Sequence, residues 1–310
     1  GIYYYFKHEK GSHKLVLADA PAAHEPVPEY ESMSYRRSDK DAPGPSLLSW
    51  RTNKRIQAGA FEHTDFDFKK PKANLVTSGS HPGEYQNAEA EVFDYPGAYT
   101  ESSVGDERAR IRMQEIAAGF ETSEGATDAA GLFPGALFTL KDCPRDDDNR
   151  EYLITAASYD ADSGAFESGS KASLRFGAAI TGIDKANNYR PPRYTSPPVI
   201  HGAQTATVVG AEGSEIWTDE YGQVKVQFHW DRYGKKDQDS SCFVRVAQSW
   251  AGDKWGRQFI PRVGQEVVVE FLEGNPDQPL VTGTVYNADN KLPFEPPGKQ
   301  PRRLALLPGN

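Results

Sequence analysis

The sequence predicts a mainly β protein of two domains, in which a β region with a small α/β part precedes a five-stranded β-barrel. Three observations lead to this fold class. Apolar and polar residues alternate through residues 224–230, which is the period of a half-buried strand. Apolar residues spaced by three and four, typical of a helix, occur convincingly only in residues 105–120. Four prolines within residues 187–201 indicate an extended, semi-rigid linker between two folded parts.

The first domain is expected to open with a β-hairpin. Apolar runs at residues 2–6 and 14–18 flank a polar turn at residues 8–12. Nothing earlier in the sequence is available to cover the other side of the first strand. The chain is therefore expected to be a piece of a longer protein.

Further strands are expected before residue 75. The segment 21–45 is rich in Pro, Ala, Glu and Ser, which predicts mostly loop with one short strand near residues 30–36. Strand-like patterns follow at residues 47–60 and 60–68. Pro71 is expected to end the second pattern because proline cannot donate to a β-ladder.

A single helix is predicted at about residues 105–120. One face carries its apolar residues, namely Ala109, Met113, Ile116, Ala117 and Phe120. Ser102, Ser103 and Asp106 offer groups that could cap its N-terminus. Three β segments are expected after it, at residues 131–140, 151–160 and 172–180.

The second domain is expected to be a small all-β barrel. Five short apolar runs between residues 216 and 286 are separated by turns rich in Gly, Pro and Asp, including turns at Gly222, Gly264 and Gly274. The alternation assigns a set of large apolar residues to the core or to a subunit interface: Val224, Val226, Phe228, Trp230, Val267, Val269 and Phe271.

Composition limits the function classes. The formal net charge of −9 argues against a general binder of nucleic acid, because phosphate binding requires a clustered field of Lys and Arg. No apolar run approaches the roughly 20 residues of a membrane span, and the start GIYYYF lacks an export leader pattern, so a soluble chain is expected. Cys143 and Cys242 are expected to be free, buried thiols in a reducing compartment.

Two residue sets could in principle bind a metal or transfer protons. His229 and Asp231 would share one face of a strand, but the sequence offers no third ligand nearby, so surface or packing roles are favoured. His63, Asp65 and Asp67 would likewise share a strand face with nitrogen and oxygen ligands. A solvated strand face is the favoured interpretation of that set.

Two acidic clusters also have plain interpretations. The run Asp146, Asp147, Asp148 and Asn149 lacks the order of a calcium loop and is expected to be a hydrated turn. The carboxylates of Glu84, Glu89, Glu91 and Asp94 are expected to line a solvated edge. The chain contains no G-x-S-x-G, HExxH, P-loop or CxxC motif. We therefore predict no enzyme activity and no catalytic, metal or cofactor site.

Four consecutive blocks of the second domain carry a family resemblance. These blocks are EIWTDEYGQVKVQFHWDR, RVAQSWAGDKWG, FIPRVGQEVVVEFLEGNPDQP and TGTVYNADN. Together they resemble the oligonucleotide/oligosaccharide-binding (OB) type barrel of the VgrG family, the spike proteins of type VI secretion systems. The GIYYYF strand resembles a segment that follows a helix inside the hub region of that family, which implies that the front of the hub is absent.

The resemblance implies a domain plan. A discontinuous hub β-barrel with a small α/β lobe is expected before the OB-type barrel. The implied bounds are 1–186 for the hub-like region (barrel about 30–75 plus 130–183, lobe about 1–29 plus 76–129), 187–199 for the Pro-rich linker, 200–290 for the OB-type barrel and 291–310 for a tail. The tail lacks the repeats of a β-helical shaft.

The resemblance also implies a function. It implies a structural hub and spike of a contractile injection machine that caps the inner tube, helps to puncture target envelopes and delivers effectors. It further implies a homotrimer, with the Hcp tube protein, a PAAR-type tip protein, baseplate proteins and effectors as partners. Transient contact with target membranes, cytoplasmic assembly and later secretion follow from the same role. The alternative is an OB-fold module that binds nucleic acid or carbohydrate.

Overall fold

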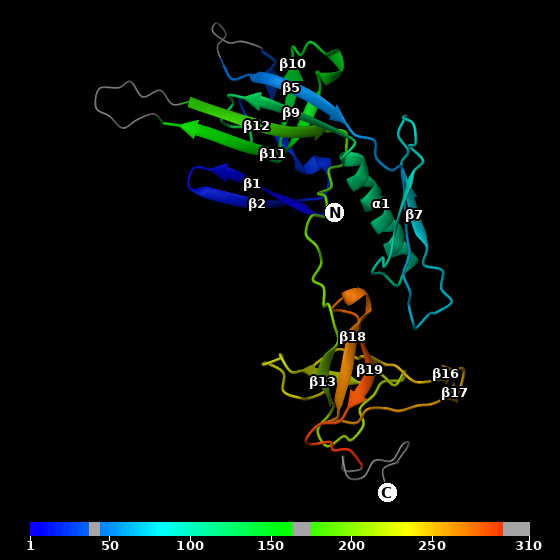
Figure 1. Cartoon of the computed structure of the whole chain (residues 1–310). Coiled ribbons are helices and arrows are strands. Elements are labelled where there is room, and N and C mark those ends of the chain that lie inside the picture. Colours follow the sequence, from blue (N-terminus) through cyan, green and yellow to red (C-terminus); the bar gives the residue numbers. More distant parts are fainter. Residues whose placement is uncertain (37–43, 164–174, 294–310) are drawn as a thin grey trace. The chain divides into compact units, whose positions relative to one another are not determined.

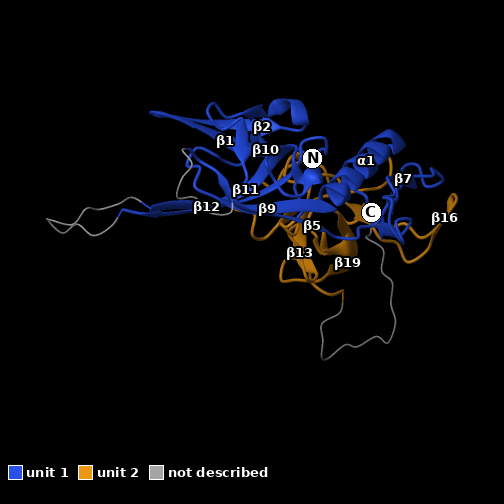
Figure 2. Cartoon of the chain, turned by 90° about the horizontal axis from the view of Figure 1, so that it is seen from above, with its two compact units in different colours: residues 1–193 blue, residues 194–310 orange. Residues whose placement is uncertain are grey.

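The computed structural model describes residues 1–36, 44–163 and 175–293. The chain divides into two compact units, residues 1–193 (unit 1) and residues 194–310 (unit 2), which are coloured separately in Figure 2. Both units are built mainly from β-strands, which confirms the predicted fold class.

A seven-stranded sheet forms the centre of unit 1. Its order is β3-β10-β11-β12-β9-β5, and β4 also pairs with β10 (Figure 1). An isolated bridge between Tyr35 and Leu47 joins the end of β4 to β5 at the opposite edge, so the sheet closes on itself there. The strands span Glu25–Pro26 (β3), Ser32–Ser34 (β4), Leu47–Lys54 (β5), Glu121–Thr127 (β9), Ala136–Lys141 (β10), Glu151–Asp162 (β11) and Arg175–Asp184 (β12).

Large side chains fill the inside of this sheet. Phe138 and Tyr152 are fully buried, and Trp50 packs edge-on against both rings, with centroid distances of 5.7 Å and 4.8 Å. Other members come from distant parts of the chain, including Met33, Leu132 and Ile180. The core of unit 1 therefore depends on contacts between segments far apart in sequence.

The only helix longer than one turn in the described chain, α1 (Ser102–Ala118), covers a three-stranded sheet in unit 1. That sheet has the order β7-β6-β8, with strands Thr77–Ser80 (β7), Ala60–His63 (β6) and Glu91–Asp94 (β8). Phe61, Ala109 and Met113 form the buried contact. Gly79 permits this close approach, because a Cβ there would lie 3.0 Å from Met113 Cγ and 3.1 Å from the Ala109 carbonyl oxygen. Glu101 precedes the helix without a side-chain cap, so the caps expected from Ser102, Ser103 and Asp106 do not form.

Three segments of unit 1 lie in other sheets than predicted. β6 was expected in the barrel but belongs to the sheet under α1, because Phe61 and His63 are buried there. β9 was expected in the lobe but pairs with β5 and β12 in the large sheet. Its buried residues are Ser123 and Thr127, so no apolar pattern marked it as a barrel strand. β3 also joins the large sheet, through β10, rather than the lobe.

A two-stranded hairpin completes unit 1. β1 (Tyr3–Glu9) pairs with β2 (Ser12–Ala18), as the apolar runs predicted. Two short 3-10 helices, η1 (Pro21–Ala23) and η2 (Asp146–Asp148), lie in the connections.

Unit 2 contains a five-stranded barrel with the order β14-β13-β18-β19-β15. Val224, beside β14, and Val244, beside β15, exchange backbone hydrogen bonds of 2.9 Å and 2.7 Å, which join the two edges. The strands span Gln204–Val209 (β13), Lys225–Phe228 (β14), Arg245–Val246 (β15), Glu266–Phe271 (β18) and Pro279–Val285 (β19). The first barrel strand is thus β13, which precedes the five apolar runs expected between residues 216 and 286; Thr218 contributes only an isolated bridge to Val224.

The barrel core consists of seven valines and one alanine. Its members are Ala206, Val208, Val224, Val226, Val244, Val267, Val269 and Val281. Phe228 and Phe271 are half-buried against it, whereas Trp230 is 67% exposed and lies outside this core. Gly222, Gly264 and Gly274 have φ of 70°, 88° and 68°, the left-handed region that glycine adopts without strain.

Candidate functional site

The outer face of the β1–β2 hairpin is an exposed apolar surface. Tyr4 lies opposite Leu17 and Phe6 opposite Leu15, so these four side chains share one face, and all four are exposed. The opposite face packs on unit 1, where Tyr5 Oη donates to the Ala23 carbonyl oxygen at 2.7 Å. Burial raises the pKa of Tyr5 in that position. The continuous apolar run YYYF, which supplies both faces, is the sequence signal for this surface.

A histidine anchors the packed side of the hairpin. His24 is buried, and its ring nitrogens lie 2.6 Å from Tyr3 Oη and 2.9 Å from the Gly135 carbonyl oxygen. Burial lowers the pKa of His24, which keeps the ring neutral. Burial also raises the pKa of Tyr3 to about 12. Both groups therefore serve as neutral hydrogen-bonding partners that fix the hairpin to the large sheet.

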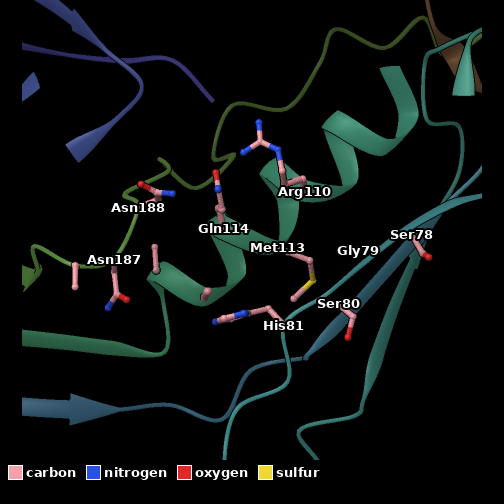
Figure 3. Close-up of a pocket in the computed structure, with 12 residues that line it drawn as sticks. Ser78, Gly79, Ser80, His81, Arg110, Met113, Gln114, Asn187 and Asn188 are labelled. Atoms are coloured by element: carbon pink, nitrogen blue, oxygen red, sulfur yellow. The ribbon is translucent and has the colours of Figure 1, made fainter. Parts of the chain in front are cut away.

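A cavity of about 430 Å³ lies beside α1 in unit 1. Figure 3 shows Arg110 and Gln114 reaching it from α1, Asn187 and Asn188 from the segment after β12, and His81 from the end of β7. Ser80 Oγ donates to the Gly59 carbonyl oxygen at 3.3 Å. The cavity offers amide and guanidinium donors.

An ion-pair network joins three strands of the large sheet. Arg150, the residue before β11, bonds to Glu121, the first residue of β9, and to Asp184, the last residue of β12, the latter at 2.8 Å. Burial alone would lower the pKa of Arg150, but hydrogen bonds to Tyr152 and Glu121 raise it. Burial alone would raise the pKa of Glu121, but hydrogen bonds from Lys54 and Arg150 hold it below its usual value. The network holds these charges in place as structural ion pairs.

The predicted set of His63, Asp65 and Asp67 is not a solvated strand face. β6 ends at His63, which is buried and lies with Nε2 2.9 Å from the Gly105 carbonyl oxygen. Asp65 accepts from the Ala98 backbone N–H at 2.5 Å, and Asp67 accepts from that of Lys69 at 2.8 Å. The two carboxylates therefore fix turns after the strand has ended.

His229 and Asp231 also have separate partners. β14 ends at Phe228; His229 Nε2 lies 3.0 Å from Thr205 Oγ1, and Asp231 accepts from the Gly234 backbone N–H at 2.9 Å. Within the described ranges, no group of three or more His, Cys, Asp and Glu side chains is arranged to hold a metal ion.

The acidic segments are placed largely as expected. Glu84, Glu89 and Glu91 are exposed, and Asp94 is half-buried. The turn at Asp146–Asp148 is a 3-10 helix, but Asp148 is buried and accepts from Thr52 Oγ1 at 2.7 Å. Asp148 is thus a structural hydrogen-bond acceptor, which corrects the expectation of a wholly hydrated turn.

The cysteines are both free thiols. Cys143 is buried in unit 1, but Cys242 is exposed in unit 2, which corrects the prediction that both are buried. Across the part of the chain that the structure describes, no helix is both long and apolar enough to span a membrane.

Unit 2 exposes aromatic side chains in two places. Trp230 is stacked on Phe228 with ring centroids 5.2 Å apart, beside exposed Tyr233. A second group belongs to a hairpin formed by β16 (Ala251–Gly252) and β17 (Trp255–Gly256), which carries Trp250 and Trp255. This hairpin was not predicted, although the segment WAGDKWG, with a polar turn between two glycines, could have indicated it. Exposed aromatic side chains of this kind are typical of surfaces that bind another molecule.

Comparisons with known proteins agree with this two-unit architecture. Residues 1–165 match the phage tail baseplate hub (GPD) family. Residues 204–286 match the type VI secretion system/phage-baseplate injector OB domain. The first match covers more than half of the chain, and the chain belongs to the phage tail baseplate hub family.

Two relatives in Pseudomonas aeruginosa are the type VI secretion system spike proteins VgrG1b and VgrG1a. Each is 42% identical to this chain over 303 residues, or 96% of it, which confirms the resemblance to VgrG. The chain spans 40% of the length of VgrG1b and 46% of that of VgrG1a.

One solved structure is similar in fold. It is an E. coli protein, c3393, described as a component of the type VI secretion system with structural similarity to the T4 bacteriophage tail proteins gp27 and gp5. The TM-score is 0.52 at 18% identity, with 92% of this chain and 57% of that chain covered. This likeness supports the hub-like fold with an OB-type barrel.

Proposed function

We propose that the chain is a structural hub and spike component of a type VI secretion machine, in which it caps the inner tube and helps to carry effectors through a target envelope. The observation that carries this proposal is the succession of a hub-type unit and an injector OB unit in one chain, along which 42% identity to spike proteins extends. The role requires cohesion rather than turnover of a substrate.

Both units have closed main sheets, which suits a component that must transmit mechanical force. In each unit the two edges of the main sheet are joined, through Tyr35 and Leu47 in unit 1 and through Val224 and Val244 in unit 2. A sheet joined in this way presents few unpaired edges for local opening. Ion pairs of Arg150, which directly precedes β11, add links to β9 and β12. The energy for injection would come from the contractile machine, and the chain would supply stiffness.

The partners and location belong to the same proposal. The chain would act as a homotrimer that contacts the Hcp tube protein, a PAAR-type tip protein, baseplate proteins and effectors. It would assemble in the cytoplasm, leave the cell through the machine and touch target membranes transiently. No enzymatic step is needed in this role, and we propose that the chain is not an enzyme.

A chimera tests the role directly. The matched segment of VgrG1b would be replaced by this chain in a Pseudomonas aeruginosa strain that lacks its other spike proteins, and release of the tube protein into the medium would be measured. We expect release near the level of the parent spike. A chimera that accumulates stably but releases no tube protein would contradict the proposal. A chimera with the Phe138→Ala substitution serves as the matched control for loss of folding.

A second function has one observation in its favour. Trp230 and Tyr233 are exposed beside Arg232, Lys235 and Lys236, which is a combination that OB-type barrels use for single-stranded nucleic acid. The net charge of −9 opposes it. Fluorescence anisotropy with a labelled 30-nucleotide DNA decides between them. We expect no submicromolar binding near physiological salt; tight, salt-sensitive binding lost in a Trp230→Ala variant would establish the second function.

A further inference from the structure

Residues 248–259 form an arm that extends from the barrel of unit 2 and carries β16 and β17 (Figure 1). Hydrogen bonds between its two sides keep it paired. Gln248 Nε2 donates to the Phe259 carbonyl oxygen at 3.1 Å, and the Arg257 backbone N–H donates to the Trp250 carbonyl oxygen at 2.8 Å. Every residue from 249 to 259 is exposed. The arm therefore has a defined shape but little packing against its own unit.

The arm carries three large aromatic side chains. Trp250, Trp255 and Phe259 are 59%, 58% and 64% exposed. The two indole rings contact each other edge to face, with centroids 5.3 Å apart. A two-stranded hairpin is marginally stable in water without further packing, and aromatic residues are enriched where proteins meet. A marginally stable hairpin with exposed aromatic rings indicates that another surface covers the arm.

Unit 2 also presents a surface with matching chemistry, which we call the aromatic shelf. It consists of Phe228, Trp230, Phe271 and Leu272. The Phe228 ring stacks with Trp230 at 5.2 Å and with Phe271 at 5.9 Å. Trp230 Nε1 donates to Gln204 Oε1 at 2.9 Å, so the indole is held in a fixed orientation. Trp230 and Leu272 are exposed, so the shelf is preformed and uncovered.

The charges on the two surfaces are complementary. The arm carries Lys254 and Arg257, both exposed and without an ion pair among the described residues. Glu270 and Glu273 flank Phe271 and Leu272 of the shelf and are likewise exposed and without an ion pair in that part of the chain. The arm also carries Asp253, and Arg232 lies two residues after Trp230, so the complementary charges are Lys254 and Arg257 of the arm and Glu270 and Glu273 beside Phe271 and Leu272.

We propose that the arm of one copy docks on the aromatic shelf of the next copy. This inference rests on the proposed function for the number of copies, because a ring of three requires a heterologous contact in which each subunit offers two different surfaces. The arm and the shelf are two such surfaces in the same unit. The contact buries the exposed aromatic rings of both and pairs Lys254 and Arg257 with the carboxylates beside the shelf.

Photocrosslinking of the full chain tests the contact. A benzophenone amino acid replaces Lys254, and equal amounts of ordinary and ¹⁵N-labelled chains are mixed and irradiated. We expect crosslinked peptides of mixed isotope composition that join the arm to segment 225–232 or segment 266–274. Crosslinks found only within single chains, or only to other segments, would overturn the proposal.

Light scattering on variants gives the second test. Trp250→Ala with Trp255→Ala, and separately Trp230→Ala, are each expected to weaken association of copies at least tenfold. Tyr194→Ala, an exposed aromatic in the same unit but outside both surfaces, is the control and should leave association unchanged. Wild-type trimers that persist in both variants would overturn this inference alone and leave the proposed function standing. A wild-type chain that stays monomeric at about 100 μM, or Trp230-dependent DNA binding in its place, would overturn both.

Discussion

The cores of the two units are built in different ways. In unit 1 the buried cluster combines Phe138, Tyr152 and Met33 with smaller residues, drawn from segments between residues 33 and 180. In unit 2 the buried cluster contains seven valines and one alanine that lie on the barrel strands or directly beside them. Valine is stiff at χ1 and suits a narrow barrel, whereas large rings need a wider interior and several elements to enclose them. Unit 1 therefore gains stability from a few large side chains, and unit 2 from many small ones.

Removing one large buried ring from unit 1 should therefore cause the largest loss of stability. Phe138→Ala deletes a fully buried side chain that packs against Trp50 and Tyr152, and we expect a loss of about 3–5 kcal/mol in the free energy of unfolding of unit 1. Hydrogen exchange followed by mass spectrometry would show lost protection in β10, β11 and β12. Phe93→Ala, at an exposed site of the same unit, should change stability by less than about 1 kcal/mol. Equal effects of the two substitutions would contradict the assigned core.

Truncating a single core valine should destabilise unit 2 less than the loss of Phe138 destabilises unit 1. Val226→Ala removes two methyl groups from the barrel core, and we expect a loss of about 2 kcal/mol. Urea unfolding monitored by tryptophan fluorescence measures the change, since four of the five tryptophans lie in unit 2. Val199→Ala at an exposed position is the matched control. A loss above about 4 kcal/mol at Val226 would show that unit 2 also depends on individual side chains.

A smaller loss of stability is expected when a carboxylate is removed from the ion-pair network of unit 1. Glu121→Gln removes the carboxylate that pairs with Lys54 and Arg150, and we expect a loss of about 1 kcal/mol at pH 7. The pKa of Glu121 is lowered from 4.5 in the folded state, so the unfolded chain takes up this proton first as the pH falls. The contribution of the carboxylate is thus complete above pH 4.5 and declines as the pH falls through the folded-state pKa.

Thermal unfolding of both proteins between pH 7 and pH 3 measures this difference. Glu84→Gln, at an exposed site outside any ion pair in the described chain, is the control and should match the wild type throughout. A gap between the Glu121 variant and the wild type that stays constant down to pH 3 would exclude an electrostatic origin.

The difference between the two cores explains why more of unit 2 than of unit 1 could be predicted from the sequence. In unit 2 the alternation Val224, Val226, Phe228 identified a strand and most of its core, because period-two burial is visible in one segment. Trp230 continues the alternation but lies beyond the end of β14, where the chain turns and leaves the ring on the surface. Periodicity records the spacing of apolar residues and does not show where a strand ends.

The unit 1 barrel was harder to predict because part of its wall is polar. β9 buries Ser123 and Thr127, and Thr127 Oγ1 donates to the Ser46 carbonyl oxygen at 2.8 Å, a bond between residues far apart in sequence. Such a strand looks like a loop until its partners are known. The exposed arm was missed for a similar reason, since Trp250 and Trp255 resemble core residues when only their apolar character is considered.

The molar mass of the chain in solution tests the proposed hub and spike role, because such a component must hold identical subunits together. Multi-angle light scattering would be measured from about 1 to 100 μM, with the chain mass of 34.2 kDa as the reference. We expect a species of three times the chain mass that becomes more populated with concentration and is lost when the arm and shelf are altered. A mass equal to one chain at every concentration would contradict it.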